Sequence, residues 1–265
     1  MTRKERLLRA IKQYSWLLIG VGLLSAAYLL PPDTSLAEVE RVGTLTACVP
    51  SQRQPLVTGN PEAPGIDVEI LNAVAGEMGL RLRLATVPAM GQDFNPRSWR
   101  LTRAQCAIVA GGLVDSRETR SFLQTSPPYA TTGWVAFSAS GNIDLNGRKV
   151  GVYAVAQGAD RIALSSYLRS QNAQITLMRT PQALADAVAE GTVDVAVSEA
   201  LLGQTLASDN GWTSGLLPPP LESYPLVFGL WKGDLTLKRA MIAAFEKVQQ
   251  DGTIDAIIER YATAA

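Results

Sequence analysis

Hydrophobic and polar positions follow two alternating patterns from residue 42 onward. Short apolar runs, typical of strands, are followed by segments whose apolar residues recur at helical spacing. Residues 42–49 form the first such run, residues 67–78 the first helical segment, and residues 80–87 the next strand. A strand, a helix and a strand in this order predict a parallel pair joined by a right-handed crossover.

A third apolar run, residues 106–110, predicts a strand buried on both faces that ends at Gly111 and Gly112. A further strand is expected at residues 131–138. A second series then runs through strands at 149–152, 175–178 and 193–197 and helices at 159–170, 181–189 and 200–208, and a strand at 226–231 with helices at 235–250 and 253–262 closes the chain.

Breaks near Thr132 and Pro220 separate these two series. We expect an α/β fold of two lobes, each a mainly parallel sheet flanked by helices. Lobe 1 would contain residues 38–131 and 221–265, and the inserted lobe 2 residues 132–220. The chain would then cross twice between the lobes, which makes a hinge, and ligand pockets favour such clefts at the C-terminal ends of strands.

The N-terminal segment has the outline of a secretory signal peptide. Residues 1–14 carry five basic side chains, and an uncharged apolar run follows at residues 15–30. Ser35 and Ala37 place small residues where a signal peptidase reads them, so we expect residues 1–37 to be removed and the body to be periplasmic. The alternative is an uncleaved anchor, although the run is shorter than the roughly 20 residues that span a bilayer.

Composition narrows the classes of function. Nearly half of the 265 residues are apolar, which is enough for a substantial core. Without residues 1–37 the chain has a small acidic excess, which argues against nucleic acid as a partner. The chain has no histidine, which excludes Ser-His-Asp or Cys-His catalysis and His-based metal sites. We expect no metal, no cofactor and no enzymatic activity.

Cys48 and Cys106 make an even cysteine count in a chain expected to be exported. Both lie in or beside predicted strands, so a disulfide is possible if these strands are neighbours. Two buried free thiols are the alternative.

The stretch at residues 106–129, CAIVAGGLVDSRETRSFLQTSPPY, is the candidate binding site. A buried strand that brings bare backbone and arginines to its C-terminal end can hold a small anion. Here Ser116, Arg117 and Arg120 follow the two glycines. An ordinary turn and helix start would give the same pattern.

This stretch resembles the AGMTITPER…FSDPYY signature of bacterial extracellular solute-binding proteins of the polar-amino-acid type, which are family 3 and have the type II periplasmic binding fold. GIDVEI at residues 65–70 is similar to their GFDVDL, LNGRKVGV at 145–152 to DLKGKKVGV, and GTVDVAVSE at 191–199 to GRVDAVVAD. The order and spacing of these motifs cover nearly everything after residue 40. The resemblance therefore implies a two-lobed binding protein.

The resemblance also implies roles for particular side chains. One arginine would grip a ligand carboxylate; the register favours Arg120 and leaves Arg117 at the rim. Glu199 would pair with an ammonium group, unless it is only a solvated helix-start carboxylate. The remaining candidate ligand-binding residues are Gly111, Gly112, Ser116, Tyr129 and Gln157, the last in a segment where the family has Gly-Thr-Thr.

The implied function is periplasmic capture of a small polar or acidic molecule by a monomer that delivers it to an ABC transporter permease in the inner membrane. Two alternatives remain open. One is a periplasmic dehydratase of the same fold, with Glu199 as a general acid. The other is a ligand-sensing accessory protein of a periplasmic enzyme system.

Overall fold

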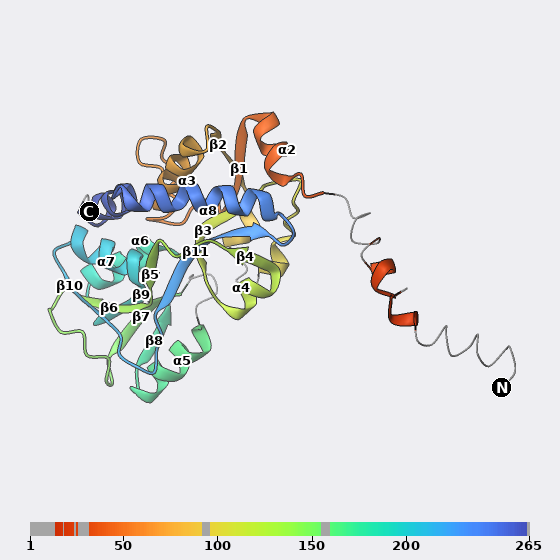
Figure 1. Ribbon diagram of the computed structural model, residues 1–265. Coiled ribbons are helices and arrows are strands. Elements are labelled where there is room, and N and C mark those ends of the chain that lie inside the picture. Colours follow the sequence, from red (N-terminus) through yellow and green to blue (C-terminus); the bar gives the residue numbers. More distant parts are fainter. Residues whose placement is uncertain are drawn as a thin grey trace, which may run out of the picture. The chain divides into compact units, whose positions relative to one another are not determined.

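A computed structural model describes residues 14–17, 19–23, 25, 32–91, 96–154 and 160–263. The chain forms two compact units, Met1–Thr34 and Ser35–Ala265 (Figure 1). In the first unit, residues 14–17 and 19–23 are helical. Among the described residues, no helix combines the length and the apolar character needed to span a bilayer.

The second unit contains two separate sheets. The first has the strand order β2-β1-β3-β11-β4, and β5 pairs with β11. Its strands are β1 (Thr44–Val49), β2 (Arg81–Thr86), β3 (Ile108–Val114), β4 (Leu123–Thr125), β5 (Ala130–Thr132) and β11 (Tyr224–Trp231). β1 pairs in parallel with β2 and β3, whereas β11 is antiparallel to β3, β4 and β5. β11, the strand nearest the C-terminus, therefore lies between β3 and β4 in the sheet that also contains the N-terminal strands β1 and β2.

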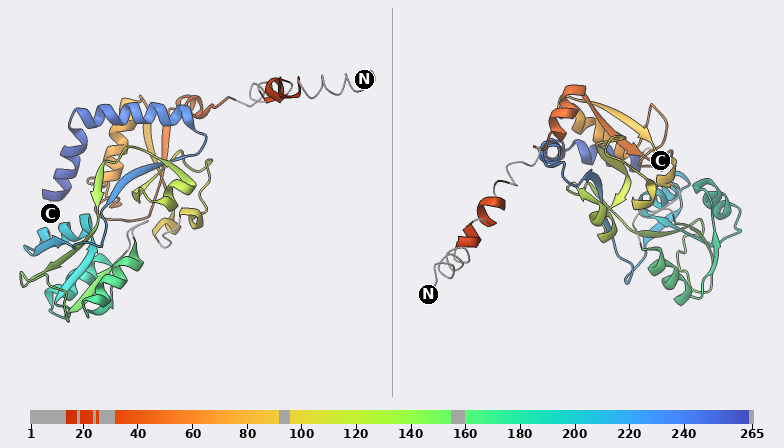
Figure 2. Two further views of the ribbon diagram at one scale, coloured as in Figure 1. Left: turned by 60° about the horizontal axis from the view of Figure 1, so that its bottom comes forward. Right: turned by 90° about the vertical axis from the view of Figure 1, so that its right-hand side faces the viewer.

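Helices cover one face of this first sheet, as the views in Figures 1 and 2 show. They are α2 (Ser35–Val42), α3 (Ile66–Glu77), α8 (Leu235–Gln250) and α9 (Thr253–Thr263). Leu45, Ala47 and Val49 of β1 join the core on this face. Cys48 points to the opposite face, whose core includes Trp99. The period-2 alternation of β1 thus separates two apolar layers.

The opposite face is covered by short elements. These are α4 (Arg117–Phe122) and the 3₁₀ helices η1 (Pro88–Gly91) and η2 (Pro96–Trp99). The Cys48–Cys106 disulfide lies in this layer, with a Cα–Cα distance of 5.5 Å. The bond forms because β1 and β3 are neighbours, with Cys48 opposite Val109.

The second sheet has the order β10-β6-β9-β7-β8. Its strands are β6 (Trp134–Ser138), β7 (Lys149–Tyr153), β8 (Gln174–Leu177), β9 (Val195–Glu199) and β10 (Thr213–Leu216), and its helices are α5 (Arg161–Ser170), α6 (Pro181–Ala189) and α7 (Ala200–Asp209). β7 is parallel to β8 and β9, whereas β6 is antiparallel to β9 and β10. Both sheets are therefore mixed. In the parallel part of each sheet, the turns that connect strands to helices lie at the same edge.

The predicted break at Gly111 and Gly112 is wrong, because β3 continues to Val114. The two glycines have φ values of 104° and 75°, and the pairing of β3 with β11 shifts register opposite them, between Val227 and Gly229. They form a β-bulge, which left-handed glycine geometry permits. The bulge turns two consecutive N–H groups toward α3.

One further expectation also needs correction. Residues 131–138 form two strands rather than one, since β5 joins the first sheet and β6 the second, with Gly133 between them. Residues 35–42, for which no helix was predicted, form helix α2. The start of α6 is as expected, because the Thr180 hydroxyl accepts a hydrogen bond from the Ala183 N–H and Pro181 opens the first turn.

Candidate functional site

A cavity of about 410 Å³ lies between loops of the two sheets. Gln52, Arg53 and Gln54 enter it from the turn that follows β1, and Tyr153 from the end of β7. The other lining residues belong to the β8–α6 turn, the start of α6, the end of β9 and α7: Arg179, Thr180, Pro181, Gln182, Glu199, Leu202 and Leu206. The cavity is thus built at the C-terminal ends of parallel strands, where open α/β sheets bind ligands.

Arg53 is held in position by its own loop. Its N–H donates to the Val57 carbonyl at 2.6 Å, and the Val57 N–H donates back at 2.7 Å. Behind it, the N–H groups of Ile66 and Asp67 donate to the carbonyls of Pro55 and Leu56. These backbone bonds fasten the arginine loop to the first turn of α3, so the guanidinium is presented by a fixed scaffold.

Asp67 connects that turn to the bulge of β3. Its Oδ2 accepts hydrogen bonds from the N–H groups of Gly111 and Gly112, at 2.6 and 2.9 Å, and its Oδ1 accepts one from the Tyr129 hydroxyl at 2.5 Å. Burial raises the pKa of the Asp67 carboxyl, an effect that the Tyr129 and glycine hydrogen bonds and the Arg53 charge oppose. The two glycine amides are therefore occupied by a carboxylate of the protein itself.

Glu199 ends β9 and caps α7. Its Oε1 and Oε2 accept hydrogen bonds from the N–H groups of Leu201 and Leu202 at 3.2 and 3.3 Å, and the Thr132 hydroxyl also donates to Oε1. Burial raises the pKa of the Glu199 carboxyl, against the effects of the Leu201 bond and the Arg53 charge. The cap fixes the direction of the side chain, while the helix start partly offsets the cost of its charge.

Arg53 and Glu199 influence each other's ionisation. Burial lowers the pKa of the Arg53 guanidinium, and the charge of Glu199 is the largest opposing effect. One of these groups follows a strand of the first sheet and the other a strand of the second. The cavity is therefore lined by a positive group from the first sheet and a negative group from the second, which suits a ligand with groups of both signs.

The sequence-predicted residues fall into two groups. The structure brings Glu199 to the cavity, and it buries Tyr129, Gly111 and Gly112 in the Asp67 network beside it. Arg120 and Arg117 are exposed on α4. Arg120 pairs with Asp115, and Ser116 caps α4 by accepting from the Thr119 N–H. Gln157 lies outside the described residues.

Arg53 and Arg179 line the cavity, although no sequence motif pointed to them. The same rule that pointed to strand ends would have found them, because each follows a predicted strand in a turn before a helix. The family resemblance pointed instead to the turn after the third strand, which carries Arg117 and Arg120, and not to the turn after the first strand, which carries Arg53. Among the described residues, no cluster of Cys, Asp and Glu side chains could hold a metal ion.

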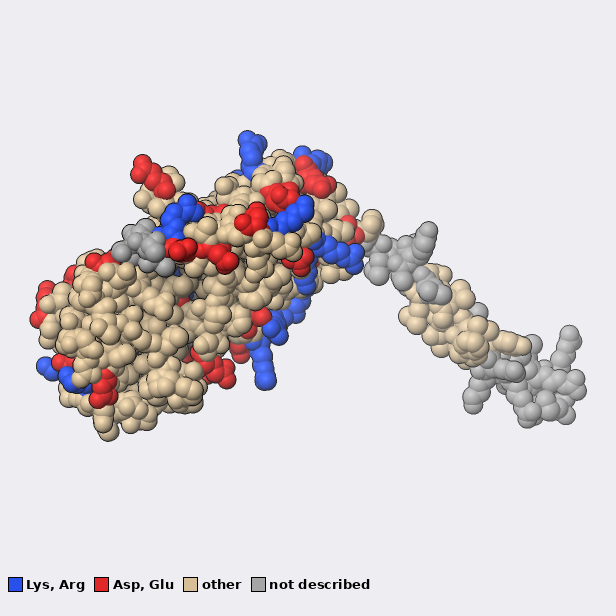
Figure 3. Space-filling model, turned by 60° about the vertical axis from the view of Figure 1, so that its left-hand side comes forward, with Lys and Arg blue, Asp and Glu red and all other residues tan. Residues whose placement is uncertain are grey.

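Charged side chains on the face shown in Figure 3 do not form a patch of one sign. On the face shown in Figure 3, basic and acidic side chains are interspersed and much of the surface is uncharged. This face presents no continuous field of one sign that would steer a polyanion. This face therefore adds no charge-based selection to that of the cavity residues Arg53, Arg179 and Glu199.

The fold and the cavity define a two-lobed binding protein. Residues 41–264 match the family described as bacterial extracellular solute-binding proteins, family 3, and the chain belongs to this family. An ancestral cationic amino acid solute-binding protein has a similar structure, with a TM-score of 0.71 and 21% identity over 86% of this chain and 99% of that one. An ancestral amino acid-binding protein described as a precursor of cyclohexadienyl dehydratase has a TM-score of 0.65, with 19% identity over 86% and 98% of the two chains.

A longer relative is the membrane-bound lytic murein transglycosylase F of Erwinia tasmaniensis. It is 23% identical over 94% of this chain and 53% of its own length. The chain thus spans about half the length of this curated relative. The structural likenesses, all at low identity, show the fold.

Proposed function

We propose that this protein captures a small zwitterionic or acidic solute in the cavity between its two lobes. Arg53 would bind an anionic group of the solute, and Glu199 a cationic group. The observation that carries the proposal is the placement of these two charges on turns of different sheets around one cavity. Arg179, at the start of α6, adds a second positive group to the wall. A charge-assisted contact with each group would fix the orientation of the solute.

We further propose that the solute draws the lobes together. Strands β5 and β6 carry the chain from the first sheet to the second, and the segment between β10 and β11 carries it back. A solute that contacts both walls favours the closed arrangement by its differential affinity for it. The radius of gyration measured by small-angle scattering should therefore decrease with saturating solute and stay constant with a non-binding one.

A thermal-shift panel of glutamine, glutamate, arginine, glutarate and butylamine tests the site. A ligand that binds only the folded state adds RT ln(1 + [L]/Kd), about 2.7 kcal/mol at a hundredfold excess. Arg53→Gln should weaken binding of every carboxylate by roughly 2–5 kcal/mol, because the ligand charge is left desolvated and unpaired. Glu199→Gln should weaken amine-bearing compounds and spare glutarate. Arg120→Gln is the matched control, and a compound whose shift survives both cavity substitutions would refute the assignment.

The family suggests a periplasmic location, and a monomer that delivers its solute to an ABC transporter permease is the transport form of the proposal. Deletion of the gene should then reduce uptake of the compound that the panel identifies. Unchanged uptake would contradict the transport role and leave only the proposal that the protein binds the solute.

The likeness to one half of a murein transglycosylase favours a second candidate, in which the module senses a solute for an enzyme. Arg53→Gln should then alter turnover of murein by the partner enzyme without altering solute uptake.

A dehydratase activity is the third possibility, with Glu199 as the acid. The purified protein should consume cyclic carboxylic acids if that is correct, and Glu199→Gln should abolish the turnover.

A further inference from the structure

Thr132 carries a buried hydroxyl at the first crossing between the two sheets. It is 2% exposed and ends β5 of the first sheet, and Gly133 separates it from β6 of the second. Its partner in the antiparallel pairing of β5 with β11 is Tyr224, which lies where the chain returns to the first sheet. The backbone of Thr132 is therefore fixed by the pairing of the two crossing segments.

The hydroxyl of Thr132 reaches the second sheet. It donates a hydrogen bond to Oε1 of Glu199, the carboxylate that ends β9 and lines the cavity. The backbone supports this contact, because the Ala200 N–H donates to the Gly133 carbonyl at 2.9 Å. Trp134 of β6 also pairs with Glu199 in register. A residue of the first sheet thus holds a carboxylate of the second.

The donors to Glu199 leave its carboxylate little freedom. A carboxylate has about four acceptor sites, two on each oxygen. Within the part of the chain that the structure describes, Oε1 accepts from Thr132 and Leu201, and Oε2 accepts from Leu202. Both sites of Oε1 are therefore used, and acceptor capacity remains on Oε2. The Leu201 and Leu202 donors are backbone N–H groups, so Thr132 supplies the one donor of the three that a substitution can remove.

We propose that Thr132 is a positioning residue that sets the selectivity of the cavity for an ammonium group. Its bond holds Oε1 toward the crossing and leaves Oε2 as the oxygen that a cationic group of the solute can approach. Thr132 does not line the cavity, so it acts through Glu199. This inference rests on the proposed function, in which Glu199 binds the cationic group. Preorganisation of the carboxylate spares the solute the cost of orienting it.

Two kinds of solute should respond differently to loss of the Thr132 hydroxyl. A zwitterion with an ammonium group depends on the oriented Glu199 carboxylate. Glutarate has carboxylates but no ammonium group, and in the proposed site it is bound by Arg53. A structural defect at the crossing would weaken both solutes, since both are bound between the same two sheets. The ratio of the two affinities therefore distinguishes positioning from a change in the fold.

Isothermal titration of the full chain with glutamine, glutamate, arginine and glutarate tests the proposal. Thr132→Val removes the hydroxyl and keeps a β-branched side chain. It should lower the affinity for the zwitterions about tenfold, the size of effect expected from one hydrogen bond to a charged group, and that for glutarate by less than about twofold. Thr132→Ser keeps the hydroxyl and should keep the wild-type ratio of affinities.

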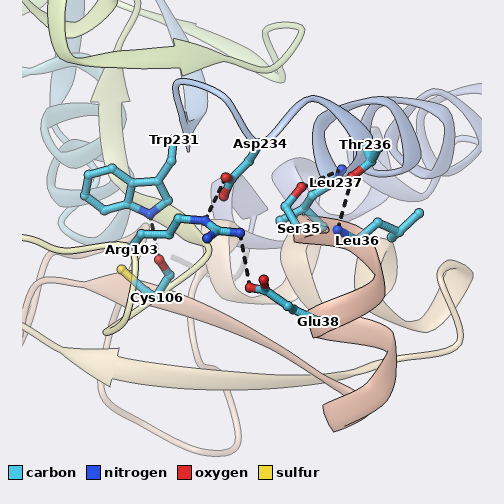
Figure 4. A network of polar contacts seen from close by, with 9 residues as sticks. All are labelled: Ser35, Leu36, Glu38, Arg103, Cys106, Trp231, Asp234, Thr236 and Leu237. Carbon is cyan, nitrogen blue, oxygen red and sulfur yellow. Dashed lines mark hydrogen bonds and ion pairs between the residues drawn. The ribbon is translucent and has the colours of Figure 1, made fainter. Parts of the chain in front are cut away.

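Thr236→Val is the matched control, because it makes the same change at a hydroxyl that bonds helix α2 and no residue of the cavity. The Thr236 hydroxyl lies 3.0 Å from that of Ser35 and accepts a hydrogen bond from the Leu36 N–H at 3.2 Å (Figure 4). This variant also removes hydrogen bonds from the fold. It should nevertheless leave the ratio of the zwitterion and glutarate affinities unchanged.

Three outcomes would contradict the inference. If Glu199→Gln weakens binding of the zwitterions and Thr132→Val does not, Thr132 has no positioning role and the proposed site stands. Equal losses for the zwitterions and glutarate in Thr132→Val would show that the hydroxyl supports the fold alone. If no zwitterion binds the wild type, or Glu199→Gln leaves their affinity unchanged, the proposed function fails and this inference fails with it.

Discussion

Arg120 and Asp115 form a two-pronged ion pair, with Nε 2.6 Å from Oδ1 and Nη2 2.5 Å from Oδ2. The pair lies on the surface at α4, and neither residue lines the cavity. Arg120→Ala and Arg117→Ala should therefore leave the ligand-induced thermal shift unchanged, while Arg53→Gln reduces it. Isothermal titration of the three variants with one ligand compares them directly. A loss of binding in Arg120→Ala alone would restore the arginine that the family resemblance favours.

Asp67→Asn should be strongly destabilising. The substituted amide can present only one acceptor oxygen to three donors, and its NH₂ group would face N–H or O–H groups in a buried site. We expect a loss of about 3 kcal/mol in the free energy of unfolding, as for other disrupted buried networks. Urea unfolding measures it. Asp144→Asn, at an exposed turn, is the matched control, and equal effects would show that the Asp67 network adds no stability.

The ionisation of Glu199 should make the free energy of unfolding depend on pH. Burial raises the pKa of this carboxyl above its ordinary value of 4.5, so the folded protein holds a proton that the unfolded chain releases at lower pH. The free energy of unfolding therefore decreases as the pH rises through the interval between the two values. Asp67 shifts in the same direction, and its contribution remains in either variant.

Glu199→Gln should consequently show a shallower decrease than the wild type in urea unfolding between about pH 4 and 7. Glu246→Gln, an exposed substitution on α8, should reproduce the wild-type slope. Parallel curves for Glu199→Gln and the wild type would mean that this carboxyl titrates normally in the folded protein.

Gly65 and Gly76 predict opposite responses to alanine. A Cβ at Gly65 would lie 2.4 Å from the Leu56 carbonyl oxygen, and its φ is 111°. Gly65→Ala should therefore destabilise the fold and displace the loop that carries Arg53, so that ligand affinity falls as well. Gly76 lies within α3 with nothing inside 4 Å of a built Cβ, and Gly76→Ala should stabilise by about 0.5–1 kcal/mol. Denaturant unfolding and titration of both variants give the comparison.

Most helices and strands followed from the sequence because their apolar spacing is strong. The bounds predicted for α6 and α8 agree with the structure, and the disulfide pairing holds because β1 and β3 are neighbours. Helix α2 was missed because the small residues Ser35 and Ala37 also fit a peptidase site. The partners that stabilise this helix lie near residue 236, beyond the reach of any local pattern.

The site was harder to predict than the fold for a similar reason. Gly111 and Gly112 were expected to line the pocket, yet their N–H groups donate to a carboxylate that lies 44 and 45 residues earlier, respectively. Which amides remain available to a ligand depends on such tertiary contacts. Arg53 and Arg120 each follow a predicted strand and look alike in sequence, and only the three-dimensional arrangement shows that one faces the cavity and the other faces solvent.

The inserted position of β11 has a consequence for the order in which the chain can fold. Ser126, just after β4, exchanges hydrogen bonds with Phe228 of β11, 102 residues later. Residues 134–216, which supply every strand of the second sheet, emerge from the ribosome before β11 exists. A nascent chain stopped short of Tyr224 could complete the second sheet, but its first sheet would keep an unpaired edge along β3. Until β11 is made, that edge is open to pairing with a strand of another chain.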